Sequence, residues 1–253
     1  MPVAIQAGLW GLLSGSALLI GALIGWFVPL GRRLVAAIMA FGAGVLISAL
    51  SFELMDEAWQ RGGFGPVAGG FLGGASVYTG CNWLLAAWGA RHRKRSCPDV
   101  RAKDKKANQE NGGALALGAL LDGIPESIVI GVSLLRGGAV GMVAVIAVFL
   151  SNLPEGLSSA AGMKAEGKSA SFVFLLWSAI ALSAGLAALG GYLAFDGVAP
   201  EWVAAVQAIA AGAILAMIVD TMVPEAFQET HDFAGLIAVS GFLVAFALSK
   251  LSG

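Results

Sequence analysis

Apolar residues along this chain gather into long runs, with none of the short alternating patterns that soluble strands and helices show. A window of about 20 predominantly apolar residues is long enough to cross the hydrocarbon core of a bilayer as a helix. The sequence contains eight such windows, at 4–28, 34–58, 65–89, 114–135, 139–163, 171–194, 202–226 and 233–251. The pattern therefore predicts an all-α, polytopic membrane protein with eight transmembrane helices.

The composition is that of a protein embedded in lipid. Of the 253 residues, 58% are hydrophobic and 12% are charged, whereas soluble domains carry about 25% charged residues. The mean hydropathy is +0.82. We therefore expect a single transmembrane domain over residues 1–253, with the lipid bilayer as a partner and no nucleic-acid partner.

One long polar segment, residues 90–113, separates the third and fourth apolar windows and is strongly basic. Together with Arg32, Arg33, Lys164 and Lys168, it places twelve of the fifteen Lys and Arg residues on one side of the membrane. Cytoplasmic loops carry such an excess of basic residues. The sequence therefore predicts a cell-membrane protein with a cytoplasmic loop at 90–113 and both termini outside the cytoplasm.

Two short polar motifs interrupt the fourth and fifth apolar windows. They read Asp122-Gly123-Ile124-Pro125-Glu126-Ser127 and Ser151-Asn152-Leu153-Pro154-Glu155-Gly156. A carboxylate at membrane depth is costly unless it is partnered, so each acid is a functional-site hypothesis. Each proline also removes a helical hydrogen bond from the carbonyl four residues earlier, and a neighbour, water or an ion can satisfy that group. The two motifs together predict a cation site.

Helical spacing gathers the polar side chains of each motif. Asp122 and Glu126 lie four residues apart, and so do Ser151 and Glu155, which places each pair on one helix face. We expect a divalent ion near the membrane midplane, bound by Asp122, Glu126, Ser151, Asn152 and Glu155. The alternative is a pair of protonated glutamates that hydrogen-bond to each other across a helix interface.

The motif pair resembles the ZIP (Zrt/Irt-like protein) family of divalent metal-ion transporters, whose fourth and fifth membrane helices carry similar Pro-Glu motifs. The match is Gly-Ile-Pro-Glu at 123–126 and Asn-Leu-Pro-Glu-Gly at 152–156. The resemblance implies eight helices, transport of zinc, iron or manganese toward the cytoplasm, and a homodimer. It also implies that helices one, four, five and six move as a unit against helices two, three, seven and eight.

The chain departs from the family pattern at three motif positions. Asp122 and Ser151 stand where the family commonly has histidine, and Gly123 stands where it often has asparagine. The resulting ligand set is all oxygen, which suits magnesium, calcium or manganese, whereas imidazole favours zinc. Ligand chemistry and family resemblance point to different ions, so the choice among zinc, iron, manganese and a harder ion stays open.

A weak internal repeat relates the second and seventh apolar windows. At a constant offset of 168 residues, Gly44 aligns with Gly212 and Glu57 aligns with Glu225. The two windows run in opposite directions across the predicted membrane, as do the two Pro-Glu motifs. This pattern predicts an inverted repeat, in which helices 1–3 correspond to helices 6–8 and helix 4 corresponds to helix 5.

Two further groups of polar residues lie near predicted helix ends. The outer group is Glu53, Asp56 and Glu57, and the inner group is Asp220, Glu225, Glu229 and His231. Each group either gathers cations at an entrance or exit, or is an ordinary solvated helix end. A stripe of small residues that includes Ser158 and Ser159 continues inward from the second motif, and it either lines an exit path or packs helices.

These observations favour transmembrane transport of divalent metal cations toward the cytoplasm, with the metal ion as substrate and with no cofactor. We do not expect an enzyme. An intramembrane metalloenzyme usually needs histidine-rich ligation, and the chain has two histidines and no His-Glu-x-x-His motif. The alternative function is a non-transporting membrane metal sensor or scaffold derived from the same family, which the missing motif histidines would favour.

Overall fold

The chain is helical throughout the part that a computed structural model describes, residues 1–87, 112–135 and 141–252. The helices are α1 (Val3–Phe27), α2 (Arg32–Ala49), α3 (Met55–Gly62), α4 (Phe64–Ala87), α5 (Gly112–Ser133), α6 (Met142–Ala165), α7 (Ala170–Phe195), α8 (Pro200–Met217), α9 (Val223–Thr230) and α10 (Ala234–Ser252). These described ranges contain no strand, so the predicted all-α class is confirmed. The predicted loop at 90–113 lies outside them, except that residues 112 and 113 begin α5.

By length and composition, five described segments are able to cross a membrane. They are Val3–Phe27, Arg32–Gly62, Met142–Ala165, Ala170–Phe195 and Pro200–Leu251. The last of these contains two of the predicted spans, 202–226 and 233–251, with a short 3-10 turn at His231–Phe233 between them. The chain is therefore a multi-pass helical membrane protein, and the number of eight spans stays a prediction.

Local sequence explains several of the helix ends. α3 ends at Gly62, and the next residue, Gly63, has a φ of 66° and a ψ of −170°, a backbone conformation that essentially only glycine adopts. α7 begins after Ser169, whose hydroxyl oxygen accepts a hydrogen bond from the Phe172 amide at 3.2 Å. The reversal at Gly63 returns the chain along the bundle as α4, the helix that packs against α8.

Close backbone contacts at glycine hold α1, α5, α6 and α7 together, and we call these helices the first group. A Cβ atom at Gly21 of α1 would collide with the Leu153 carbonyl of α6, and one at Gly156 of α6 would collide with the Leu18 carbonyl of α1. A Cβ atom at Gly131 would bring α5 into the same conflict with α7. Because lipid tails are as apolar as leucine, this close van der Waals packing is what associates helices within a membrane.

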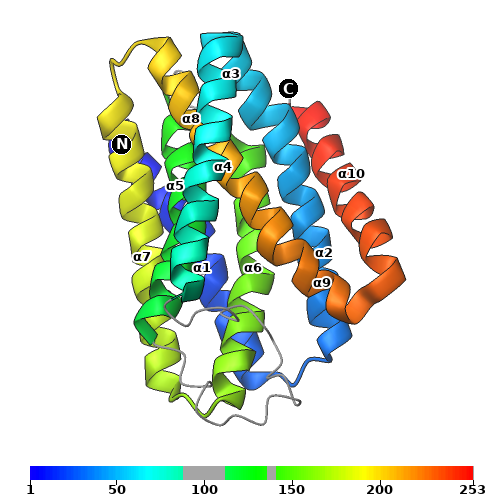
Figure 1. The fold of residues 1–253 in the computed structure, drawn as a ribbon. Coiled ribbons are helices and arrows are strands. Elements are labelled where there is room, and N and C mark those ends of the chain that lie inside the picture. The colour runs from blue at the N-terminus through cyan, green and yellow to red at the C-terminus, as the bar shows by residue number, and fades with distance from the viewer. Residues whose placement is uncertain (88–111, 136–140, 253) are drawn as a thin grey trace.

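The remaining helices, α2, α3, α4, α8, α9 and α10, form the second group. Here glycine contacts join α2 to α10 and α4 to α8. The contacts are Gly44 with the Ala238 carbonyl, Gly241 with the Phe41 carbonyl, Gly212 with the Phe71 carbonyl, and Gly74 with the Ile209 carbonyl. Figure 1 shows α7 of the first group and α10 of the second group at opposite edges of the bundle.

The second group contains two segments of matching construction, related by a shift of 168 residues. α2 and α8 each have 18 residues, each continues into a five-residue π-helical segment (Leu50–Leu54 and Ile218–Met222), and α3 and α9 each have 8 residues. The glycine contacts correspond as well, since Gly44 and Gly212 occupy the same place in the two segments. The offset found in the sequence thus coincides with the boundaries of three consecutive elements.

The glycine contacts lead to a stability prediction. Gly44→Ala places a methyl group against the Ala238 carbonyl and is expected to destabilise the fold by about 1–3 kcal/mol. Gly73→Ala is the matched control, because an added Cβ there meets no atom within 4 Å, and alanine is the better helix former by up to about 1 kcal/mol. Thermal unfolding in detergent should therefore give a lower midpoint for Gly44→Ala only. Equal midpoints for the two variants would contradict the proposed close contact.

Candidate metal site

α5 carries two acids into the interior of the bundle. Asp122 and Glu126 are each only 2% exposed, whereas Ile124 between them is 39% exposed. The acids stand one turn apart, so the same helix face buries both carboxyl groups. The helix continues through Pro125, and next to this proline the hydroxyl of Ser127 donates to the Gly123 carbonyl at 2.7 Å.

Asp122 receives a hydrogen bond from the second helix group. The phenol of Tyr78 in α4 donates to Asp122 Oδ1 at 2.8 Å, and Tyr78 is 1% exposed. The sequence analysis did not find this residue. One signal was available, because the chain has two tyrosines, one of them Tyr78 inside a predicted span, and a buried tyrosine usually needs a partner for its hydroxyl.

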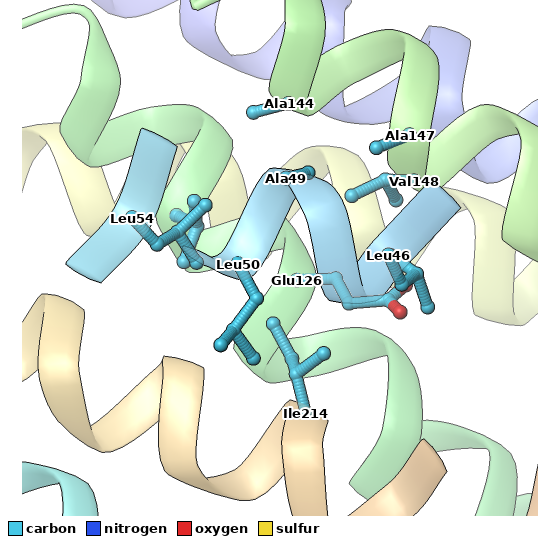
Figure 2. A pocket seen from close by; sticks show the side chains of 10 residues that line it. Leu46, Ala49, Leu50, Leu54, Glu126, Ala144, Ala147, Val148 and Ile214 are labelled. Atoms are coloured by element: carbon cyan, nitrogen blue, oxygen red, sulfur yellow. The ribbon is translucent and has the colours of Figure 1, made fainter. Parts of the chain in front are cut away.

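Glu126 borders a small cavity at the junction of the two groups (Figure 2). The cavity is small, with room for about one water molecule. Apart from Glu126 its walls are apolar, and they are formed by Leu46, Ala49, Leu50, Leu54, Val129, Ala144, Ala147, Val148 and Ile214. These residues come from α2 and its π segment, α5, α6 and α8. A carboxylate beside such walls needs a proton or a cation to offset its charge.

The second motif lies on α6, and its side chains point in more than one direction. Asn152 is buried, and its amide group donates to the Ser14 carbonyl of α1 at 3.2 Å, inside the first group. The hydroxyl of Ser151 donates to the Val148 carbonyl of its own helix at 2.9 Å. Glu155 is half-buried. The amide of Asn152 therefore helps to fasten α6 to α1.

The structure does not bring the three motif acids into one metal-binding cluster. Among the residues that it describes, no group of three or more His, Cys, Asp and Glu side chains is placed to hold a metal ion. Asp122 and Glu126 are together on α5, and Glu155 is on α6. Their convergence on one ion stays a prediction.

The outer group of polar residues is divided between the interior and the surface. Glu57 is 8% exposed and forms an ion pair with Arg61 at 2.6 Å, so it is not a solvated helix end. Asp56 is exposed and accepts a hydrogen bond from Gln60 at 2.8 Å. The half-buried Glu53 accepts a hydrogen bond from Ser249 of α10 at 2.5 Å.

The inner group is divided in the same way. Glu225 is 8% exposed and accepts a hydrogen bond from Ser158 of α6 at 2.6 Å. Asp220 and His231 are exposed, and Glu229 is half-buried. Glu225 thus lies inside the protein, in contact with the stripe of small residues on α6, whereas His231 lies on the surface beside the Phe227 ring.

Comparison with known proteins gives one relative with a named activity. The chain is 28% identical over 214 residues to an Arabidopsis thaliana protein named "Putative zinc transporter". The match covers 83% of this chain and 33% of that protein, so the chain spans about a third of the relative's length. No profile of a known protein family matches the chain.

The different surroundings of Glu57 and Asp56 lead to a prediction. Glu57→Gln removes the charge that pairs with Arg61 in a largely buried position, and it should reduce the free energy of unfolding by about 1–3 kcal/mol. Asp56→Asn, at an exposed neighbouring position, should change it by about 0.5 kcal/mol or less. Thermal unfolding of both variants measures this difference. A larger loss for Asp56→Asn would contradict the burial described for Glu57.

Proposed function

We propose that this protein transports divalent metal cations across the cell membrane toward the cytoplasm, as a single transmembrane domain over residues 1–253. The metal ion is the substrate, and the transporter needs no cofactor. Support comes from the ZIP-like motif pair on α5 and α6 and from the 28% identity to the relative named "Putative zinc transporter". Because this relative is named as a transporter, the comparison also favours a protein that is not an enzyme.

The observation that carries the proposal is the burial of Asp122 and Glu126 in an apolar membrane helix. Both are 2% exposed, and both lie on the face of α5 that meets the second helix group. Burial of two acids one turn apart is costly for packing alone, whereas it suits a site that binds a cation and then releases it. In the proposal Ser151, Asn152 and Glu155 of α6 complete the ligand set when the ion is bound.

The proposed architecture has eight transmembrane helices arranged as an inverted repeat. α2, its π segment and α3 correspond to α8, its π segment and α9, and the matching boundaries at an offset of 168 residues support this relation. In this architecture the first three transmembrane spans correspond to the last three. The fourth span, α5, corresponds to the fifth span, α6. Repeats of this kind let one unit move against the other around a central site.

The two helix groups are the natural candidates for these moving units. The first group, α1, α5, α6 and α7, corresponds to helices one, four, five and six of the ZIP-like scheme, and it contains both Pro-Glu motifs. Both termini lie outside the cytoplasm in the proposal, following the distribution of Lys and Arg. The resemblance also leads us to propose a homodimer. Within each subunit of the proposal, Glu225 and Ser158 lie toward the cytoplasmic exit.

A membrane metal sensor or scaffold without transport is the second candidate function. The observation that favours it is the presence of Asp122 and Ser151 where related transporters commonly have histidine. Uptake of radioactive zinc and manganese by proteoliposomes discriminates between the two functions. A transporter accumulates ions inside the vesicles, whereas a sensor binds them at the protein and leaves the vesicle lumen empty.

The proposed site leads to a prediction for its two glutamates. Glu126→Gln and Glu155→Gln should each abolish high-affinity ion binding, because each removes a charge from a ligand set shielded from water. Glu201→Gln is the matched control, since Glu201 is exposed at the start of α8. Equilibrium binding of zinc and manganese to the purified protein measures the effect. Parent-like binding by either motif variant would show that the ion lies elsewhere.

A second prediction concerns ion selectivity. The parent, with its oxygen ligands, should prefer harder ions such as manganese or magnesium more than histidine-bearing relatives do. The double substitution Asp122→His with Ser151→His should strengthen zinc binding relative to manganese, since zinc gains more from imidazole. Competition binding across a panel of divalent ions decides this, and an unchanged zinc-to-manganese ratio would exclude both positions from the ligand set.

A further inference from the structure

Side-chain hydrogen bonds between described residues join the helix groups to each other. The Tyr78 phenol of α4 donates to Asp122 of α5 at 2.8 Å, and the Ser158 hydroxyl of α6 donates to Glu225 of α9 at 2.6 Å. The amide of Asn152 by contrast bonds within the first group, to α1. Side-chain hydrogen bonds thus join helices within a group and also join the two groups to each other.

The two groups also pack against each other, in a buried apolar cluster that contains Val129 and Ala147 of the first group and Ile214 of the second. A Cβ atom added at Gly42 of α2 would lie 3.4 Å from the Cα of Ser151 in α6, which is ordinary van der Waals contact. Inside the groups, glycines such as Gly21 and Gly44 admit no Cβ at all. The cavity beside Glu126 also lies at this boundary. A hydrogen bond between two buried side chains adds a directional contact to this apolar packing, and it helps to hold the groups in register.

We propose that Tyr78 is a positioning residue that holds the two helix groups in register while the site is empty, and that a divalent cation bound at Asp122 releases this link. The inference rests on the proposed function, because it takes Asp122 as an ion ligand. Tyr78 itself does not bind the ion. It acts through Oδ1 of Asp122, on the opposite side of the boundary between the groups.

The release follows from the electrostatics of the carboxylate. An ionised carboxylate is a strong acceptor, and its hydrogen bond to a buried phenol is correspondingly strong. A divalent cation draws the same negative charge toward itself, so the hydrogen bond from Tyr78 weakens when the ion binds. Movement between the groups is then opposed in the empty protein and less opposed in the loaded protein.

Spin-label distances test the link directly. One label is placed at Leu72 of α4 and one at Leu182 of α7, which are 68% and 59% exposed, after Cys81→Ser and Cys97→Ser remove the native thiols. The parent should show one distance without metal and a second one with Zn²⁺, which is diamagnetic. In Tyr78→Phe without metal, the fraction of molecules at the second distance should be about tenfold higher than in the parent without metal. This is the effect expected for the loss of a hydrogen bond to a charged acceptor. An unchanged distribution in Tyr78→Phe, or no response of the parent to Zn²⁺, overturns the proposal.

The other tyrosine of the chain provides the matched control. Tyr192→Phe on α7 makes the same chemical change at a half-buried position inside the first group, and it should leave the distance distribution as in the parent. A shift in Tyr192→Phe equal to that in Tyr78→Phe would show a general loosening and would overturn the proposal. Ser158→Ala breaks the hydrogen bond to Glu225 that also crosses between the groups, and this variant should retain the response to Zn²⁺.

Transport assays separate failure of this inference from failure of the proposed function. Net ion uptake requires return of the empty carrier, whereas exchange of bound ions does not. Tyr78→Phe should therefore raise the ratio of net uptake to exchange by about tenfold, and an unchanged ratio counts against the link. If the parent moves no ion in either assay while its label distances respond to Zn²⁺ and to Tyr78→Phe, the link stands and transport is wrong.

Discussion

Backbone contact at glycine is the interaction on which the rest of this structure depends. In a bilayer, apolar side chains gain little by leaving lipid for protein, so helices associate where their backbones approach closely. Gly21 and Gly156 bring α1 and α6 into such contact, and Gly44 and Gly241 do the same for α2 and α10. The contacts lie within two helix groups, and the boundary between the groups is where Asp122, Glu126 and the cavity are found.

The positions of the helices were predictable because their cause is local. A chain in hydrocarbon must satisfy the hydrogen bonds of its backbone within each helix. A long run of apolar residues is therefore sufficient evidence for a helix. The window at 4–28 corresponds to α1, and the window at 171–194 to α7. The offset of 168 residues was also visible in the sequence, although its agreement with the two π segments was not, because nothing in the residues marks a π turn.

The environment of each polar side chain was much less predictable, because it depends on which helices approach. Asn152 points to Ser14 of α1, a partner 138 positions away in the chain, and Tyr78 points to Asp122 across the boundary between the groups. Glu57 and Glu225 were interpreted either as ion-gathering residues or as solvated ends, and both are buried. Sequence spacing gave the helix face of each residue but not the neighbour that this face meets.

The paired π segments also bear on the history of the chain. A π turn adds a residue to an α-helix and so rotates everything after it by about 100°. Leu50–Leu54 and Ile218–Met222 do this at corresponding places, and after the turn Glu57 and Glu225 both face the interior. On the proposed repeat, one ancestral insertion copied along with its half accounts for both segments, so the insertion is older than the duplication. On the same proposal, the side chains of the two halves have diverged since the duplication, and the irregular backbone is the more durable record of a common origin.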